Sequence, residues 1–163
     1  MILVKLLSHL LLMFALLAST QSLAEELEPF QSWIAKRPQW SDDEGEVSYA
    51  YTRCGTLLMI LGRIFIANPS VDDDIRVGKD SKDRGSALLL FGNMLGNSKG
   101  MSNEFLSKRF DLVSKSYLDR ITINRRLHNN MFHGYILSDY HFCLKIEAEL
   151  RDAINRESAK RSQ

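Results

Sequence analysis

The chain has 163 residues, of which 45% are hydrophobic, 9% aromatic and 25% charged, with a formal net charge of +1. This composition is ordinary for one folded domain and excludes collagen-like, coiled-coil-only and wholly disordered proteins. Beyond a leader that carries Lys5, acidic and basic side chains are equal in number. A neutral chain lacks the field that attracts nucleic acid or an anionic membrane, so we expect neither as a partner.

Residues 1–24 have the layout of a secretory signal peptide. A short basic start at Lys5 precedes the apolar run Leu6–Ala18, and the small residues Ser22 and Ala24 suit a cleavage site directly after Ala24. The apolar run is shorter than the roughly 20 residues that a membrane-spanning helix needs, although an uncleaved anchor is the alternative. We expect a periplasmic or secreted protein without a membrane span after cleavage.

The two cysteines, Cys54 and Cys143, are an even number in a compartment where thiols oxidise. Their disulfide would close a loop of roughly 90 residues, which constrains the unfolded chain strongly. Two buried free thiols are the alternative. Neither residue belongs to a C-x-x-C motif, so a redox-active pair or covalently attached haem is not predicted.

Residues 25–40 combine two prolines and two tryptophans with polar side chains, outside any periodic helix. We interpret them as an N-terminal arm with about one helical turn around residues 30–36. Because tryptophan is enriched at binding hot spots, Trp33 and Trp40 are candidate partner-binding residues. The alternative is that both side chains fold back to cover one end of the domain.

A single helical domain is predicted over residues 41–163. Ser41 and Glu44 fit a capping box, and apolar side chains then recur at steps of three or four up to Ile64. Asn68 ends this first helix, about 42–67, because the residue before a proline is driven out of helical geometry.

Residues 70–84 are interpreted as a polar loop. A short segment over 85–95 follows, which we predict as a helix with a buried strand as the alternative. Gly96 and Gly100 then indicate a stop and a turn. The loop contains three consecutive acids that are further candidate partner contacts: Asp72, Asp73 and Asp74.

Two further helices complete the prediction. Ser102 begins the third, whose apolar stripe runs from Leu106 toward Leu127. Residues 129–134 interrupt, and the last helix carries apolar residues from Ile136 to Ile154 before a basic tail. We therefore expect an all-α bundle of about four helices, with one disulfide joining the first and last.

The cysteine pairing predicts a register if the first and last helices run antiparallel. Leu61 would then lie opposite Ile136, and Val47 opposite Leu150. Both pairs are apolar, as a coiled-coil-like seam requires.

No constellation of residues predicts catalysis, a metal or a cofactor. His128, His133 and His141 lack the spacing that places two imidazoles on one helical face. Ser138, Asp139 and His141 are neighbours on one helix and do not converge as a catalytic triad. We expect Ser138 and Asp139 to cap a helical turn.

The leading hypothesis is a non-enzymatic exported protein that binds a protein partner in the envelope, as an immunity protein, inhibitor or accessory chaperone does. One alternative is a small-ligand or metal-binding bundle with a pocket lined by Tyr117, Tyr140, His128 or His141. Another is an uncharacterised envelope enzyme, which would need converging carboxylates or histidines in a cleft.

Overall fold

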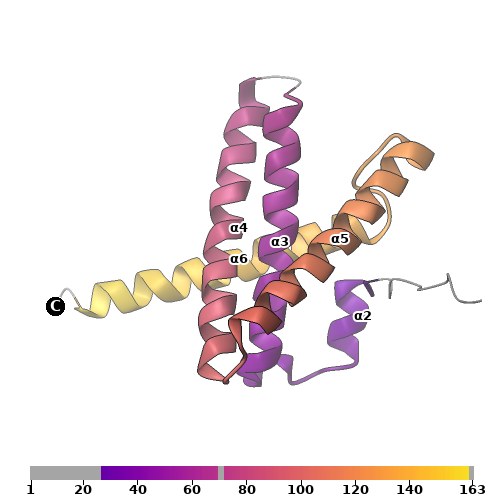
Figure 1. Ribbon diagram of the computed structural model, residues 1–163. Helices are drawn as coiled ribbons and strands as arrows, with labels where there is room; N and C mark the ends of the chain where they lie inside the picture. The colour runs from indigo at the N-terminus through magenta and orange to yellow at the C-terminus, as the bar shows by residue number, and fades with distance from the viewer. Residues whose placement is uncertain (1–26, 70–71, 162–163) are drawn as a thin grey trace, which may run out of the picture.

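The computed structural model describes residues 27–69 and 72–161, so the predicted signal peptide, residues 1–24, lies outside the described residues. The described chain holds helices and no strand, which confirms the all-α bundle with four long helices. In chain order, the elements of Figure 1 are α2 (Phe30–Ala35), the 3₁₀ turn η1 (Trp40–Asp42), α3 (Glu44–Ala67), α4 (Asp72–Ser98), α5 (Asn103–His128) and α6 (Tyr135–Arg161).

Helix α3 begins two residues later than the capping box predicted. Residues 40–42 form η1, so Asp43 rather than Ser41 is the cap. An Asp43 side-chain oxygen accepts hydrogen bonds from the backbone N–H groups of Gly45 at 2.7 Å and Glu46 at 3.2 Å. This satisfies donors that a helix start otherwise leaves without partners. The predicted end at Asn68 is confirmed.

Helix α4 overturns the prediction of a polar loop for residues 72–84 and of a stop at Gly96, whereas positions 70 and 71 of that predicted loop lie outside the described residues. Residues 72–98 form one continuous helix that runs antiparallel to α3 (Figure 1). The segment 85–95, predicted as a helix, lies in its second half. Its first half is too polar to have an obvious apolar stripe. Packing against α3 stabilises it instead, because helices in proteins owe most of their stability to tertiary contacts.

Glycines spaced by seven residues bring the backbones of α3 and α4 into contact. A Cβ atom at Gly55 would lie 2.7 Å from the carbonyl oxygen of Gly85, and one at Gly62 would lie 2.6 Å from that of Gly78. One further step along this register, Ser48 donates a hydrogen bond to the carbonyl of Gly92 at 2.7 Å. The two helices therefore form a hairpin that only glycine permits at these contacts.

Replacing Gly85 with alanine is expected to lower the free energy of unfolding by about 2–3 kcal/mol, because the new methyl group overpacks a close contact. Its Cβ would meet the Gly55 carbonyl at 2.7 Å and the backbone nitrogen of Met59 at 2.8 Å, and backbone cannot rotate away. Urea unfolding measures the change, with Ser86→Ala on the exposed face of α4 as control. A gain of about 1 kcal/mol, usual for glycine to alanine in an open helix, would contradict the close packing.

The boundaries of α5 and α6 follow the predicted signals. The Ser102 hydroxyl accepts a hydrogen bond from the N–H of Phe105 at 3.1 Å and caps α5. Asn129 ends the helix in the left-handed conformation with φ of 49°, and Gly134 adopts φ of 62° just before α6 begins. Asparagine and glycine tolerate this conformation best, which explains the break between the two helices.

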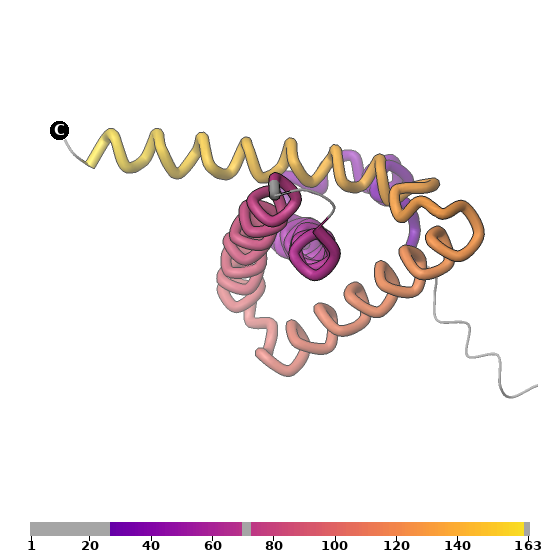
Figure 2. The backbone as a smooth tube through the Cα atoms, turned by 90° about the horizontal axis from the view of Figure 1, so that it is seen from above, coloured from indigo at the N-terminus to yellow at the C-terminus, as the bar shows by residue number. Residues whose placement is uncertain are grey.

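The predicted antiparallel seam between α3 and α6 is wrong. Figure 1 shows α6 crossing behind the α3–α4 hairpin, and Figure 2, which looks along α3, shows α6 lying across it. The disulfide joins the two helices at this crossing. The register paired α3 with the wrong neighbour, since the helix that runs alongside α3 is α4.

Helix α3 occupies the centre of the molecule, between α4, α5 and α6. Its length and apolar composition would suffice to cross a membrane, but most of this apolar stretch is buried inside the bundle. The side chains around it form the core, which includes Leu57, Leu58, Leu61, Tyr117, Ile121, Ile136 and Ile146.

Candidate functional site

The predicted disulfide between Cys54 and Cys143 is confirmed. It joins the middle of α3 to α6 across 89 residues, and both cysteines are fully buried. A disulfide is consistent with a compartment where thiols oxidise, in agreement with the predicted export.

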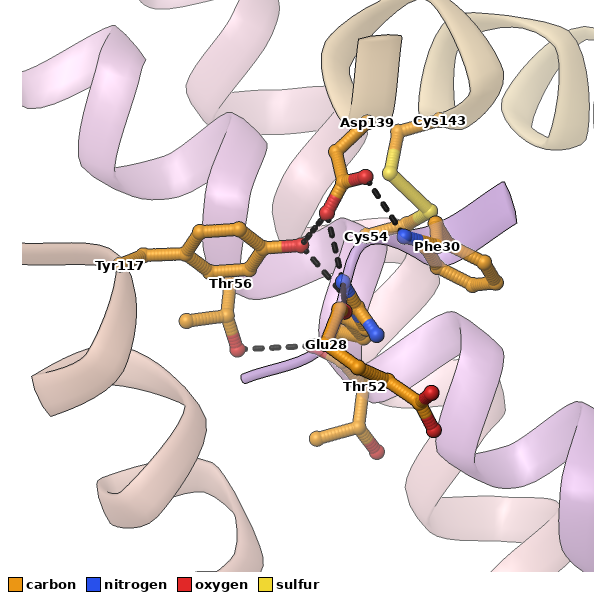
Figure 3. Close-up of a disulfide and its surroundings, with 9 residues drawn as sticks. Glu28, Phe30, Thr52, Cys54, Thr56, Tyr117, Asp139 and Cys143 are labelled. Atoms are coloured by element: carbon orange, nitrogen blue, oxygen red, sulfur yellow. Dashed lines mark hydrogen bonds and ion pairs between the residues drawn. A yellow bond between two sulfur atoms is a disulfide. The ribbon is translucent and has the colours of Figure 1, made fainter. Parts of the chain in front are cut away.

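Beside the disulfide lies a group of three side chains, Arg53, Tyr117 and Asp139, that we name the buried polar cluster. The Arg53 guanidinium donates from Nη2 to Asp139 Oδ2 at 2.6 Å and from Nε to the Tyr117 hydroxyl at 3.0 Å (Figure 3). The same hydroxyl donates to Asp139 Oδ2 at 2.8 Å. All three side chains are 0% exposed, so this is an ion pair removed from water.

The cluster also holds the segment before α3, residues 27–43, which we name the strap. The backbone N–H of Phe30 donates to Asp139 Oδ1 at 2.8 Å, and Arg53 Nη2 donates to the carbonyl of Glu28. Arg53 Nη1 has no hydrogen-bond partner among the described residues, but the guanidinium carbon lies 4.5 Å from the centre of the Phe30 ring. One cluster therefore ties the strap, α3, α5 and α6 together.

The electrostatics of the cluster favour the charged arginine and the neutral phenol. Burial disfavours the charged guanidinium, but the neighbouring Tyr117 and Asp139 outweigh it and raise the pKa of Arg53. Burial raises the pKa of the Tyr117 hydroxyl well above its usual value. Because no member is exposed, the cluster offers no surface for a substrate, and its geometry supports a structural role.

The residue pattern did not point to Arg53, and the predicted role of Asp139 as a turn cap is wrong. Asp139 does not cap a turn, since both of its oxygens face the buried cluster. A usable signal was present: Arg53 is the only charged residue in α3 between Glu46 and Arg63, and it adjoins Cys54. A charge inside an apolar helix needs a partner, and the cysteine pairing points to α6.

The two tryptophans of the strap pack against the bundle. Trp33 is 3% exposed, with its ring centre 5.3 Å from that of Tyr49. Trp40 is half-buried, 6.3 Å from Phe142, and lines a shallow open hollow beside Arg37. This is the covering position that the alternative interpretation described. Whether either residue contacts a partner stays a prediction.

The three candidate acids lie in the first turn of α4. Asp73 is exposed and pairs with Arg76 at 3.3 Å, and Asp74 is half-buried. Negative charge suits the positive end of a helix dipole, which accounts for an acidic run at this position. Their role in partner binding stays a prediction.

The four side chains suggested for a ligand pocket do not line one cavity. Tyr117 belongs to the buried polar cluster, whereas His128 is exposed and stacks on His133 with ring centres 3.6 Å apart. Tyr140 packs on Phe132, and His141 is exposed. The described ranges contain no group of three or more histidine, cysteine or acidic residues placed to hold a metal ion.

A feature that sequence analysis missed is a row of exposed apolar side chains along α5. Phe105 and Leu127, at opposite ends of the helix, are 53% and 67% exposed, and Leu112 between them is 68% exposed. With Ile123, they fall within about 60° of one another around the helix axis. We name this row the α5 stripe. It lies on a different face from the side chains that α5 buries: Leu106, Val113, Tyr117, Ile121 and Asn124.

The α5 stripe is the candidate interaction site. Single exposed apolar residues are normal, but several on one face make that face a candidate for contact with another molecule. Comparison of the chain with protein-family models, with curated proteins and with solved structures finds no match.

Proposed function

We propose that this protein works outside the cytoplasm as a non-enzymatic binding protein that recognises another protein through the α5 stripe. An immunity protein, an inhibitor or an accessory chaperone each acts by binding another protein. The proposal combines the signal-peptide pattern with the observation that carries it, the large apolar side chains left exposed along α5.

The arrangement of α5 supports recognition by this helix. Its inner face is fixed to α3 by buried side chains such as Val113 and Ile121, so the outer face is presented on a rigid support. A binding surface held in one conformation loses less entropy when a partner arrives. The α5 stripe also extends over most of the length of the helix, which suits an elongated contact.

Affinity capture from envelope extract tests this function. The protein and its Leu118→Asp variant are expected to retain one protein in stoichiometric amount, whereas Leu112→Asp is expected to reduce the yield at least about tenfold. Leu118 is the matched control because it is also exposed but lies about 145° from the α5 stripe around the helix.

Circular dichroism would establish that both variants are folded. Equal capture by all three proteins, or the absence of any stoichiometric protein, would refute binding through the α5 stripe.

A further inference from the structure

We infer that the α5 stripe receives an amphipathic helix of the partner whose apolar ridge is flanked by acidic residues, with a carboxylate facing Arg126. This inference rests on the proposed function and adds the chemistry of the partner. It follows from the charges beside the stripe, from its length and from the polar residues that interrupt it.

The charges on α5 are unequal. The helix has six basic residues and three acidic ones. Lys108 is paired with Glu104 at 2.6 Å, and Lys115 with Asp119 at 2.8 Å, so these four side chains largely cancel one another. The excess positive charge therefore comes from elsewhere on the helix.

Two arginines account for much of this excess at the C-terminal end of α5. Arg125 and Arg126 are exposed, and neither makes an ion pair with any residue in the described ranges. Arg126 is adjacent to Leu127 and three residues from Ile123, so its side chain emerges beside the α5 stripe. A partner with acidic groups at this end would meet a complementary charge.

A second copy of this chain fits less well. Two copies of α5 packed in parallel would set Arg126 against Arg126, which is repulsive. Packed antiparallel about Ser116, they would set Arg126 against the Lys108–Glu104 ion pair of the other copy, whose charges already cancel. Neither direction offers Arg126 a free carboxylate, so the charges favour an acidic partner over self-association.

A membrane surface also fits less well. The α5 stripe has a gap between Leu112 and Ile123, about 16 Å along the helix, where Ser116 and Asp119 emerge instead of apolar groups. A lipid layer would have to accommodate the Asp119 carboxylate at its interface. Membrane-bound helices spread basic residues along the polar face, whereas the exposed arginines of α5 without an ion pair in the described ranges, Arg125 and Arg126, lie together at one end.

The length of the α5 stripe fits a helix. From Phe105 to Leu127 it spans roughly 33 Å, or about six helical turns. The two apolar pairs at its ends would contact two sets of apolar side chains on a partner helix, as in complexes where an amphipathic helix lies along another helix.

Two synthetic amphipathic helical peptides of equal length and with the same leucine ridge test the inference. Glutamates flank the ridge in one peptide and lysines in the other. Fluorescence anisotropy would measure their binding to the purified protein with its disulfide intact. The glutamate peptide is expected to bind about tenfold more tightly than the lysine peptide, with a preference that weakens as salt is added.

Variants locate the contact. Leu112→Asp is expected to weaken binding of the glutamate peptide about tenfold, and Leu118→Asp to leave it unchanged. Arg126→Glu should abolish the preference for the glutamate peptide, whereas Arg63→Glu, at an exposed position on α3, should preserve it.

Equal binding of the two peptides, or binding of neither, would overturn the inference. The inference would also be overturned if the protein bound phosphatidylcholine vesicles that contain phosphatidylglycerol more tightly than the glutamate peptide, and if Leu112→Asp abolished this vesicle binding. Stripe-dependent capture of a protein from envelope extract without a preference between the peptides would leave the proposed function in place and refute only the acidic partner.

Discussion

Replacing both Cys54 and Cys143 with alanine is expected to lower the free energy of unfolding by about 4 kcal/mol. The disulfide joins positions 89 residues apart, so it removes a large part of the conformational freedom of the unfolded chain. Urea unfolding of the oxidised protein and of the double variant measures the difference.

The chemically reduced protein is the control, because its two thiols fill the same space as the disulfide. Its free energy of unfolding should be close to that of the double variant. The remaining difference between the two free energies reports the packing of the lost sulfur atoms. A loss below about 1 kcal/mol would mean that the bond contributes little beyond the contacts around it.

The second large effect is expected from Asp139→Asn, which should lower the free energy of unfolding by about 3–5 kcal/mol. The substitution preserves the shape of the side chain but leaves Arg53 buried with no opposite charge, and Arg53 and Asp139 are both 0% exposed. The hydrogen bonds to the Tyr117 hydroxyl and the Phe30 N–H do not replace the lost ion pair. Equilibrium unfolding in urea gives the magnitude.

Asp119→Asn is the matched control, because Asp119 pairs with Lys115 on the surface, where such pairs contribute at most about 1 kcal/mol. The double variant Arg53→Met, Asp139→Leu should recover much of the loss, since removing both charges leaves no unpaired ion in the core. If Asp139→Asn and Asp119→Asn had the same effect, the buried polar cluster would not stabilise the fold as we describe.

The local signals along this chain predicted most of the helix boundaries. Ser102 caps α5, Asn129 ends it, and Asn68 ends α3, each by contacts within a few residues. The cysteine pair was also predictable, because two cysteines in a domain that is predicted to be exported allow one intramolecular bond. The helix ends depend on residues that are neighbours in the sequence, and each cysteine has only one other cysteine in the chain with which to pair.

The site was harder to predict. Arg53 and Asp139 lie 86 residues apart and meet because α3 and α6 cross. The apolar side chains of α5 read as one broad face in the sequence, and nothing local separates buried Val113 from exposed Leu112. Which part of that face is covered depends on where α3 lies.

The sequence by itself determined an all-α domain with one disulfide, because residue composition, capping and apolar periodicity act locally. Only the tertiary structure decided that residues 72–84 belong to a helix, since contact between the glycine backbones of α3 and α4 holds a segment with little apolar character. The tertiary structure also decided that α6 crosses α3 and that the outer face of α5 stays exposed, because packing between distant segments selects which apolar faces are buried.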